Sequence, residues 1–238
     1  MGTELDILVF AAHPDDAELS CGGTIAKEVA KGQRVGVIDL TRGEMGTRGT
    51  TEIRADESKV AAEILGLALR ENLGLRDGHI TNDEASQAAV AACVRRYRPR
   101  VVICNAPRDR HPDHGHASEL VVDACFKAGM AKWDIEGSHH AAHRPEAIYH
   151  YIQYYDLDPD VLVDISGYEA VKMKAIKAHA SQFYNPDSDE PETLIASKDF
   201  LNAIERRTSE WGRAIGVASA EGFIAERSLG VASISELI

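Results

Sequence analysis

The sequence lacks paired cysteines, a basic excess and any long hydrophobic run. Its four cysteines are scattered, without a Cys-x-x-Cys pair, so they indicate neither a thiolate metal site nor a disulfide framework, and we expect buried free thiols. The formal net charge is −12. Because an acidic surface repels phosphate groups, we predict no nucleic-acid partner and no membrane partner.

No targeting segment is visible in the sequence. The apolar run at residues 7–12 is too short for a signal peptide or a membrane span, and we therefore expect a cytoplasmic protein. The 238 residues show no internal repeat and no linker between domains. A chain of this length can bury one sizeable core, so we predict a single domain over residues 1–238.

Apolar runs alternate with amphipathic stretches along the chain. The pattern predicts strands at residues 5–12, 34–40, 101–105, 147–153 and 161–165, and helices at residues 18–31, 52–65, 82–97, 116–130, 168–181 and 199–212. Strands that are apolar on both faces and alternate with helices are typical of a covered parallel sheet. We predict an α/β fold, a Rossmann-like three-layer sandwich with a mostly parallel central sheet. Residues 133–144 and 185–192 are predicted loops, and the sequence does not show whether the second closes over a ligand.

Polar, titratable clusters follow three of the predicted strands, at residues 12–18, 41–49 and 108–114. In an open parallel sheet, ligands bind at the carboxyl ends of the strands. We therefore expect the three clusters to meet at one edge of the sheet, where they would form the functional site.

The first strand-to-helix turn lacks the Gly-x-Gly-x-x-Gly fingerprint of a dinucleotide-binding protein and carries His-Pro-Asp-Asp at residues 13–16 instead. Two carboxylates there would repel a pyrophosphate and attract a divalent cation. His13 and Asp16, with a histidine from residues 110–114, would supply three zinc ligands and leave one position open. Asp15 would then be free to exchange a proton with an attacking water. The residues thus favour metal-assisted amide hydrolysis.

Simpler interpretations of the same residues exist. A lone His-x-x-Asp is common in loops and helix caps, Pro14 and Pro112 could simply mark turns, and the two aspartates could favour the start of the following helix. The histidines at 139, 140 and 143 are expected to form an exposed run. Two His-Pro-Asp blocks after two strands weigh toward the metal site, while a nucleotide-binding protein and a non-catalytic metal-binding protein stay as alternatives.

The paired blocks, His-Pro-Asp-Asp at 13–16 and His-Pro-Asp-His at 111–114, resemble the LmbE/PIG-L family of zinc-dependent deacetylases. The similarity continues at residues 22–24, 40–44, 54–57, 179–183 and 220–223. Within the family, residues 39–49, 71–78, 149–153 and 181–184 are similar to the deacetylases of bacillithiol biosynthesis. The resemblance implies removal of an acetyl group from an N-acetylglucosaminyl conjugate, with N-acetyl-α-D-glucosaminyl L-malate as the expected substrate.

The resemblance also implies a role for each site residue. The implied metal ligands are His13, Asp16 and His114, although the two histidines of the second block could exchange roles. Asp15 would be the general base and afterwards the acid, while His111, oriented by Asp113, would stabilise the tetrahedral intermediate. The cofactor would be Zn²⁺, with another divalent ion such as Fe²⁺ as the alternative.

The expected substrate is a small anionic amino sugar. The implied substrate contacts are Arg54, Glu44, Arg42, Arg110 and Tyr184. Four arginines flank the expected pocket and could pair with carboxylates of the substrate, namely Arg42, Arg48, Arg108 and Arg110. We expect at least one of these four to be purely structural. Arg54 could instead pair with Glu57. Other conjugates of the same family, such as an inositol glycoside, an S-conjugate or a chitooligosaccharide, stay as alternatives. A homo-oligomer is the expected assembly.

Overall fold

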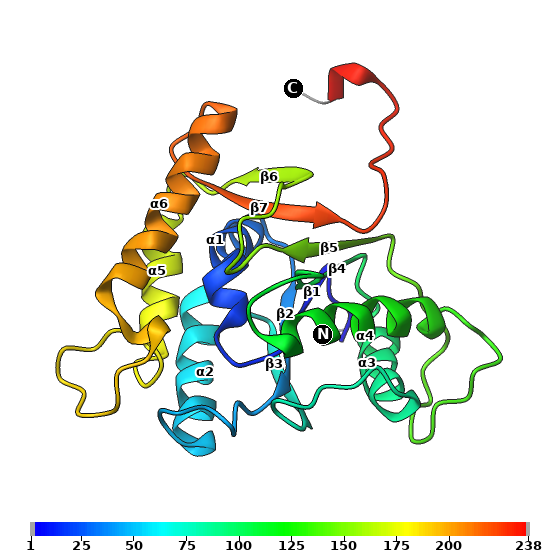
Figure 1. Ribbon diagram of the computed structural model, residues 1–238. Helices are drawn as coiled ribbons and strands as arrows, with labels where there is room; N and C mark the ends of the chain where they lie inside the picture. The colour runs from blue at the N-terminus through cyan, green and yellow to red at the C-terminus, as the bar shows by residue number, and fades with distance from the viewer. Residues whose placement is uncertain (1–2, 237–238) are drawn as a thin grey trace.

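A single mixed sheet runs through the computed structural model, which describes residues 3–236. Its strands lie in the order β3-β2-β1-β4-β5-β7-β6 (Figure 1). Their bounds are Ile7–Ala11 (β1), Val35–Thr41 (β2), Leu69–Leu75 (β3), Val101–Asn105 (β4), Ala147–Tyr151 (β5), Val161–Asp164 (β6) and Ala220–Ala225 (β7). Strands β3, β2, β1, β4 and β5 are parallel, and β7 is antiparallel to both of its neighbours. The predicted mostly parallel α/β fold is confirmed.

Helices cover both faces of this sheet (Figure 1). Helices α1 (Asp16–Ala30), α2 (Thr51–Leu65) and α5 (Glu169–Ala178) pack together on one face, and α3 (Glu84–Tyr97) and α4 (Pro112–Ala128) pack together on the other. Helix α6 (Lys198–Ile215) lies against β7 and β6. Short 3-10 turns occupy Leu194–Ala196 and Ile234–Glu236. Among the described helices, none combines the length and the apolar character needed to cross a membrane.

The central strand β1 shows why its sequence is continuously apolar. Leu8 and Phe10 belong to the core cluster beneath α3 and α4, whereas Val9 and Ala11 belong to the cluster beneath α1. All four are fully buried. A strand with both faces covered has no solvent side, so the usual alternation of apolar and polar residues disappears.

Two strands differ from the expectation of the sequence analysis. Strand β3 was not predicted, because its segment Leu-Arg-Glu-Asn-Leu-Gly-Leu mixes leucines with charged and polar residues and is only partly buried at the edge of the sheet. Residues 220–223, one of the segments that resemble the family, were not predicted as a strand, but they lie in β7, between β5 and β6. Because β7 is an interior strand, its Glu221 is completely buried.

Glu221 explains the Gly-Gly-Thr segment that follows the first motif. Helix α1 is kinked at Cys21, whose φ of −133° interrupts the helical hydrogen-bond ladder. The freed N–H groups of Gly23 and Thr24 donate to the two carboxylate oxygens of Glu221 at 2.9 and 2.7 Å. A Cβ at residue 23 would lie 2.6 Å from the side chain of Ile165 and 3.1 Å from the Glu221 carboxylate, so a larger residue there would displace both side chains. The kink fixes the first turn of α1, which carries Asp16.

Candidate active site

The three predicted metal ligands meet at the carboxyl edge of the sheet. His13 follows β1, Asp16 begins α1, and His114 lies in the first turn of α4. Nδ1 of His13 is 3.3 Å from Nε2 of His114, and the Asp16 carboxylate lies 3.4 Å from each of these nitrogens. Two ligands of a tetrahedral zinc ion, each about 2.0–2.1 Å from the metal, stand roughly 3.4 Å apart. The donor set and its spacing therefore fit a zinc ion.

In His13 and His114, the ring nitrogen that does not face the ligand set contacts carboxylates. Nδ1 of His114 contacts Asp109 at 2.7 Å, and Nε2 of His13 contacts Asp77 at 3.0 Å and Asp113 at 3.5 Å. Such carboxylates fix the ring orientation of metal-binding histidines. The carboxylate of Asp113 also accepts the N–H groups of Gly78 and Ile80. The Asp113 side chain therefore orients His13, whereas we predicted from the sequence that it would orient His111. Asp113 contacts His111 through its backbone, whose N–H donates to His111 Nδ1 at 3.2 Å.

The electrostatics of this cluster favour positive charge. Burial opposes the protonated form of His114, but Asp16 and Asp109 outweigh it and raise the pKa of His114 to about 9. Burial alone would raise the pKa of Asp16, yet His114 and His13 hold it well below its usual range. An ionised carboxylate between two imidazoles is a setting in which a divalent cation is stabilised.

Asp15 lies beside the ligand set in a different environment. Burial raises its pKa to about 6, against the opposing effect of Arg54. Nη2 of Arg54 donates to Asp15 Oδ2 at 3.1 Å and to the carbonyl of Pro14 at 2.8 Å. The backbone of Asp15 has a φ of 134°, an unusual conformation for a residue with a side chain. Arg54 and the turn thus hold a proton-exchanging carboxylate next to the cation site.

His111 is the N-cap of α4 and completes the cluster, with its ring centroid 4.6 Å from that of His13. Burial and the neighbouring His13 and His114 lower its pKa. Because Nδ1 accepts the N–H of Asp113, the neutral ring carries its proton on Nε2 and can donate it to a ligand. His13, His111 and His114 also form a group that could hold a metal ion, so the exchange of roles within the second block stays open geometrically.

The predicted substrate contacts divide into two sets. Arg54 and Arg110 line the catalytic pocket, together with the histidines, Asp15 and Asp16. Glu44, Arg42 and Tyr184 do not line it. Glu44 accepts the N–H groups of Arg42 and Asp77, Arg42 lines a separate pocket beside β3, and Tyr184 is an exposed side chain. Arg54 pairs with Asp15, while Glu57 accepts two hydrogen bonds from Ser181.

The other flanking arginines are engaged elsewhere. Arg48 is buried and donates to Ser188 at 2.7 Å, and the neighbouring N–H of Gly49 donates to Glu190 at 3.1 Å. These bonds attach the predicted loop 185–192 to the loop that follows β2. Arg108 stacks over Tyr155. Arg48 therefore fits the expectation that one of the four arginines is structural.

Three residues of the site were not identified as such from the sequence. Asp77 and Asp109 orient the histidines, as described above. Gln153, just after β5, donates from Nε2 to Asp16 Oδ1 at 2.7 Å. Asp77 follows β3, so recognising that strand would have placed it at the same sheet edge. Asp109 lies within the cluster at residues 108–114. The sequence does not show that its side chain, rather than that of a neighbour, points toward His114.

Imidazoles and carboxylates that meet at one edge of an α/β sheet are typical of a metal-dependent hydrolase. Comparison with known proteins identifies the family. The profile of the PIG-L family, GlcNAc-PI de-N-acetylase, matches residues 8–125. A diacetylchitobiose deacetylase of Thermococcus kodakarensis is 33% identical over 187 residues, 74% of this chain and 70% of the relative. The chain belongs to the PIG-L family and is an N-deacetylase.

Two further comparisons extend this result. A probable N-acetyl-α-D-glucosaminyl L-malate deacetylase 2 of Bacillus anthracis is 29% identical over 202 residues, 77% of this chain and 84% of the relative. The crystal structure of a conserved protein from Thermus thermophilus superposes with a TM-score of 0.85 and 39% identity. The superposition covers 96% of this chain and 98% of that one. The similarity therefore extends over almost the whole fold.

Proposed function

We propose that the chain is a zinc-dependent N-deacetylase that releases acetate from an N-acetylglucosaminyl conjugate. The observation that carries this proposal is the convergence of His13, Asp16 and His114 at zinc-like spacing, with the ionisable Asp15 beside them. The similarity to a diacetylchitobiose deacetylase and to a probable N-acetyl-α-D-glucosaminyl L-malate deacetylase supports the substrate class.

The residues of the site divide the chemistry among them. A zinc ion held by His13, Asp16 and His114 would activate a water molecule and polarise the acetamide carbonyl. Asp15 accepts the proton that the attacking water loses, and later delivers it to the departing sugar amine. Arg54 keeps Asp15 in place for both transfers. His111 donates from Nε2 to the oxyanion of the tetrahedral intermediate.

The aglycone is the finer part of the proposal. The sequence favours L-malate, whose two carboxylates would need cationic partners. Arg110 lines the catalytic pocket and lies over the ring of Tyr154 at 5.3 Å, so it is the flanking arginine available for a carboxylate. The other three do not line the catalytic pocket: Arg42 lines the pocket beside β3, Arg48 bonds to Ser188 and Arg108 stacks over Tyr155. An inositol and a second amino sugar are the competing aglycones, and the cavity between α1 and α6 beside the catalytic pocket favours such a neutral ring over malate.

Acetate release from a substrate panel tests this function. N-acetylglucosamine and its malate, inositol and N-acetylglucosaminyl conjugates would each be assayed with purified protein, before and after chelation, and after adding back Zn²⁺ or Fe²⁺. We expect acetate from at least one conjugate, loss of activity on chelation, and recovery with zinc. Release that continues unchanged in the stripped protein would refute the metal-dependent mechanism, and the rates with the two ions identify the metal that supports catalysis.

A further inference from the structure

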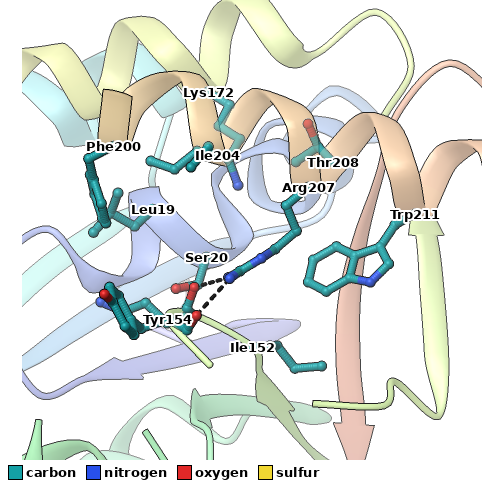
Figure 2. A pocket seen from close by; sticks show the side chains of 12 residues that line it. Leu19, Ser20, Ile152, Tyr154, Lys172, Phe200, Ile204, Arg207, Thr208 and Trp211 are labelled. Atoms are coloured by element: carbon teal, nitrogen blue, oxygen red, sulfur yellow. Dashed lines mark hydrogen bonds between the residues drawn. The ribbon is translucent and has the colours of Figure 1, made fainter. Parts of the chain in front are cut away.

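A second cavity adjoins the catalytic pocket, between α1, α6 and the segment after β5 (Figure 2). Its volume is about 300 Å³, at the small end of the range for ligand pockets. Leu19 and Gln153 line both cavities. Because Gln153 Nε2 binds Asp16, an occupant of the second cavity would lie directly beside the side chain that supports a metal ligand.

Two polar atoms at this cavity have no partner among the described residues. Ser20 is only 3% exposed, and its Oγ makes no hydrogen bond. Oε1 of Gln153 is also unpartnered. Leaving buried polar atoms unsatisfied costs about 1–3 kcal/mol each. An amide oxygen can only accept a hydrogen bond, so the complementary ligand carries donors such as hydroxyl groups.

The two cations in the walls are already engaged. Lys172 pairs with Glu221 in the protein interior. Arg207 of α6 donates to the backbone carbonyls of Gln153 and Tyr154, bonds that Figure 2 shows, and to Asp156. A carboxylate-bearing aglycone would have to compete with these partners. The cavity therefore suits a neutral ligand better than a malate.

The remaining walls are apolar and aromatic. The side chains of Tyr154, Phe200 and Trp211 surround the cavity, with Ile152 and Ile204 between them (Figure 2). Rings with C–H faces and hydroxyl edges match such a mixture of aromatic surface and isolated hydrogen-bond acceptors. From this chemistry and the shared wall, we propose that the cavity is the aglycone subsite of the deacetylase. It binds a neutral polyhydroxy ring, a sugar or an inositol, linked to the N-acetylglucosamine.

This inference rests on the proposed function, and substrate selectivity tests it. The readout is the ratio of kcat/KM for N,N′-diacetylchitobiose, or for the inositol conjugate, to kcat/KM for N-acetylglucosamine. In Ser20→Ala the ratio should fall roughly threefold to tenfold, the loss of about one hydrogen bond. Ala203→Trp places a ring at the rim of the cavity and should bring the ratio close to one. The two substrates distinguish a sugar from an inositol.

Matched control variants separate the cavity from general effects. Thr24→Val also removes a buried, unpartnered hydroxyl from α1, and Glu205→Trp also adds an indole to α6, but neither residue lines the cavity. Both should keep the wild-type ratio. Equal losses for one-ring and two-ring substrates in Ser20→Ala and Ala203→Trp, or a higher kcat/KM for the malate conjugate than for both ring conjugates, would overturn the proposal.

Binding can be followed without turnover, because the chain has two tryptophans and Trp211 lines the cavity. In Trp133→Phe, the fluorescence of Trp211 should change saturably with N,N′-diacetylchitobiose and not with N-acetylglucosamine. Trp211→Phe, which keeps Trp133, should give no signal. A flat titration of Trp133→Phe refutes the subsite even if the enzyme is active. A saturable titration supports the subsite even if the enzyme releases no acetate. Absence of acetate release would instead refute the proposed function.

Discussion

Asp15 combines a buried carboxylate, an arginine partner and a backbone φ of 134°, and Asp15→Asn tests its role in proton transfer. Asparagine keeps the oxygen that accepts from Arg54 and tolerates positive φ better than most residues, but it cannot accept the proton of a water. We expect kcat to fall by about 10²–10⁴-fold, while elemental analysis finds the zinc content of the wild type. Full activity in this variant, or loss of its zinc, contradicts the assignment.

His111→Ala removes the proposed donor to the oxyanion. Loss of one such donor lowers kcat by about 10²–10³-fold. The metal should remain, since His13, Asp16 and His114 form the proposed ligand set. The comparison variant is His114→Ala, which should lose the metal together with activity. If His111→Ala releases the metal and His114→Ala retains it, the two histidines have exchanged the roles proposed here.

Gln153 is a positioning residue that acts through Asp16. In Gln153→Leu the carboxylate loses its 2.7 Å hydrogen bond, and metal affinity should fall by about 10–100-fold, as for other partners of metal ligands. Competition with a chromogenic chelator measures this directly. Gln182→Leu is the control, because Gln182 lines the same pocket but bonds to Arg48 and Ser181. Equal metal affinities in the wild type and Gln153→Leu would contradict the positioning role of Gln153.

At the scale of elements, the apolar strands were predictable, including β6 at one edge of the sheet, whereas β3 at the other edge and β7 were not. Residues 7–11 and 101–105 are apolar because helices cover both faces of the sheet there. Strand β3 has polar residues because it lies at an edge, and β7 combines a glycine with a buried glutamate. The alternation of β3 is interrupted by Glu71, and β7 does not alternate apolar with polar residues. Tertiary contacts, which no local pattern contains, decide both.

The same contrast holds for the site. The two His-Pro-Asp blocks located its histidines and aspartates, because residues that directly follow parallel strands must meet at one edge. The direction of each side chain was not predictable. Asp113 turns toward His13 and away from His111, and Glu44 supports Asp77 outside the pocket. Such choices depend on hydrogen bonds between segments far apart in the sequence.

Glu221 joins β7, α1 and α5, so its replacement should destabilise the protein. In Glu221→Gln, Lys172 is left at 3% exposure without a carboxylate partner. Breaking one side of a buried pair costs about 3–5 kcal/mol, which urea unfolding would measure. Lys172→Met added to Glu221→Gln should recover part of the loss. Glu210→Gln, in the exposed pair with Arg213, should change stability by less than about 1 kcal/mol. Equal stability of Glu221→Gln and wild type would contradict this account.

At the scale of the whole molecule, the proposed cation site would join the two helical layers. Asp16 belongs to α1 on one face of the sheet and His114 to α4 on the other, while His13 follows strand β1, which lies between the two layers. A bound cation stabilises the folded chain by about 2.7 kcal/mol at a free concentration one hundred times its Kd. A change of that size shifts Tm by roughly 5–11 °C in a domain of this length. The layers should therefore unfold together and at higher temperature when zinc is bound.

Calorimetry of the zinc-loaded and stripped protein tests both parts of this prediction. A single domain over residues 1–238 should give one cooperative transition in each state, with the lower Tm in the stripped protein. His114→Ala should give the same Tm with and without zinc, because one of the proposed ligands is missing. Light scattering on the same samples would test the expected homo-oligomer and hold the assembly state constant between scans. Two separated transitions in the stripped protein would show that the layers fold independently, and a Tm unaffected by zinc would place the cation outside the junction of α1 and α4.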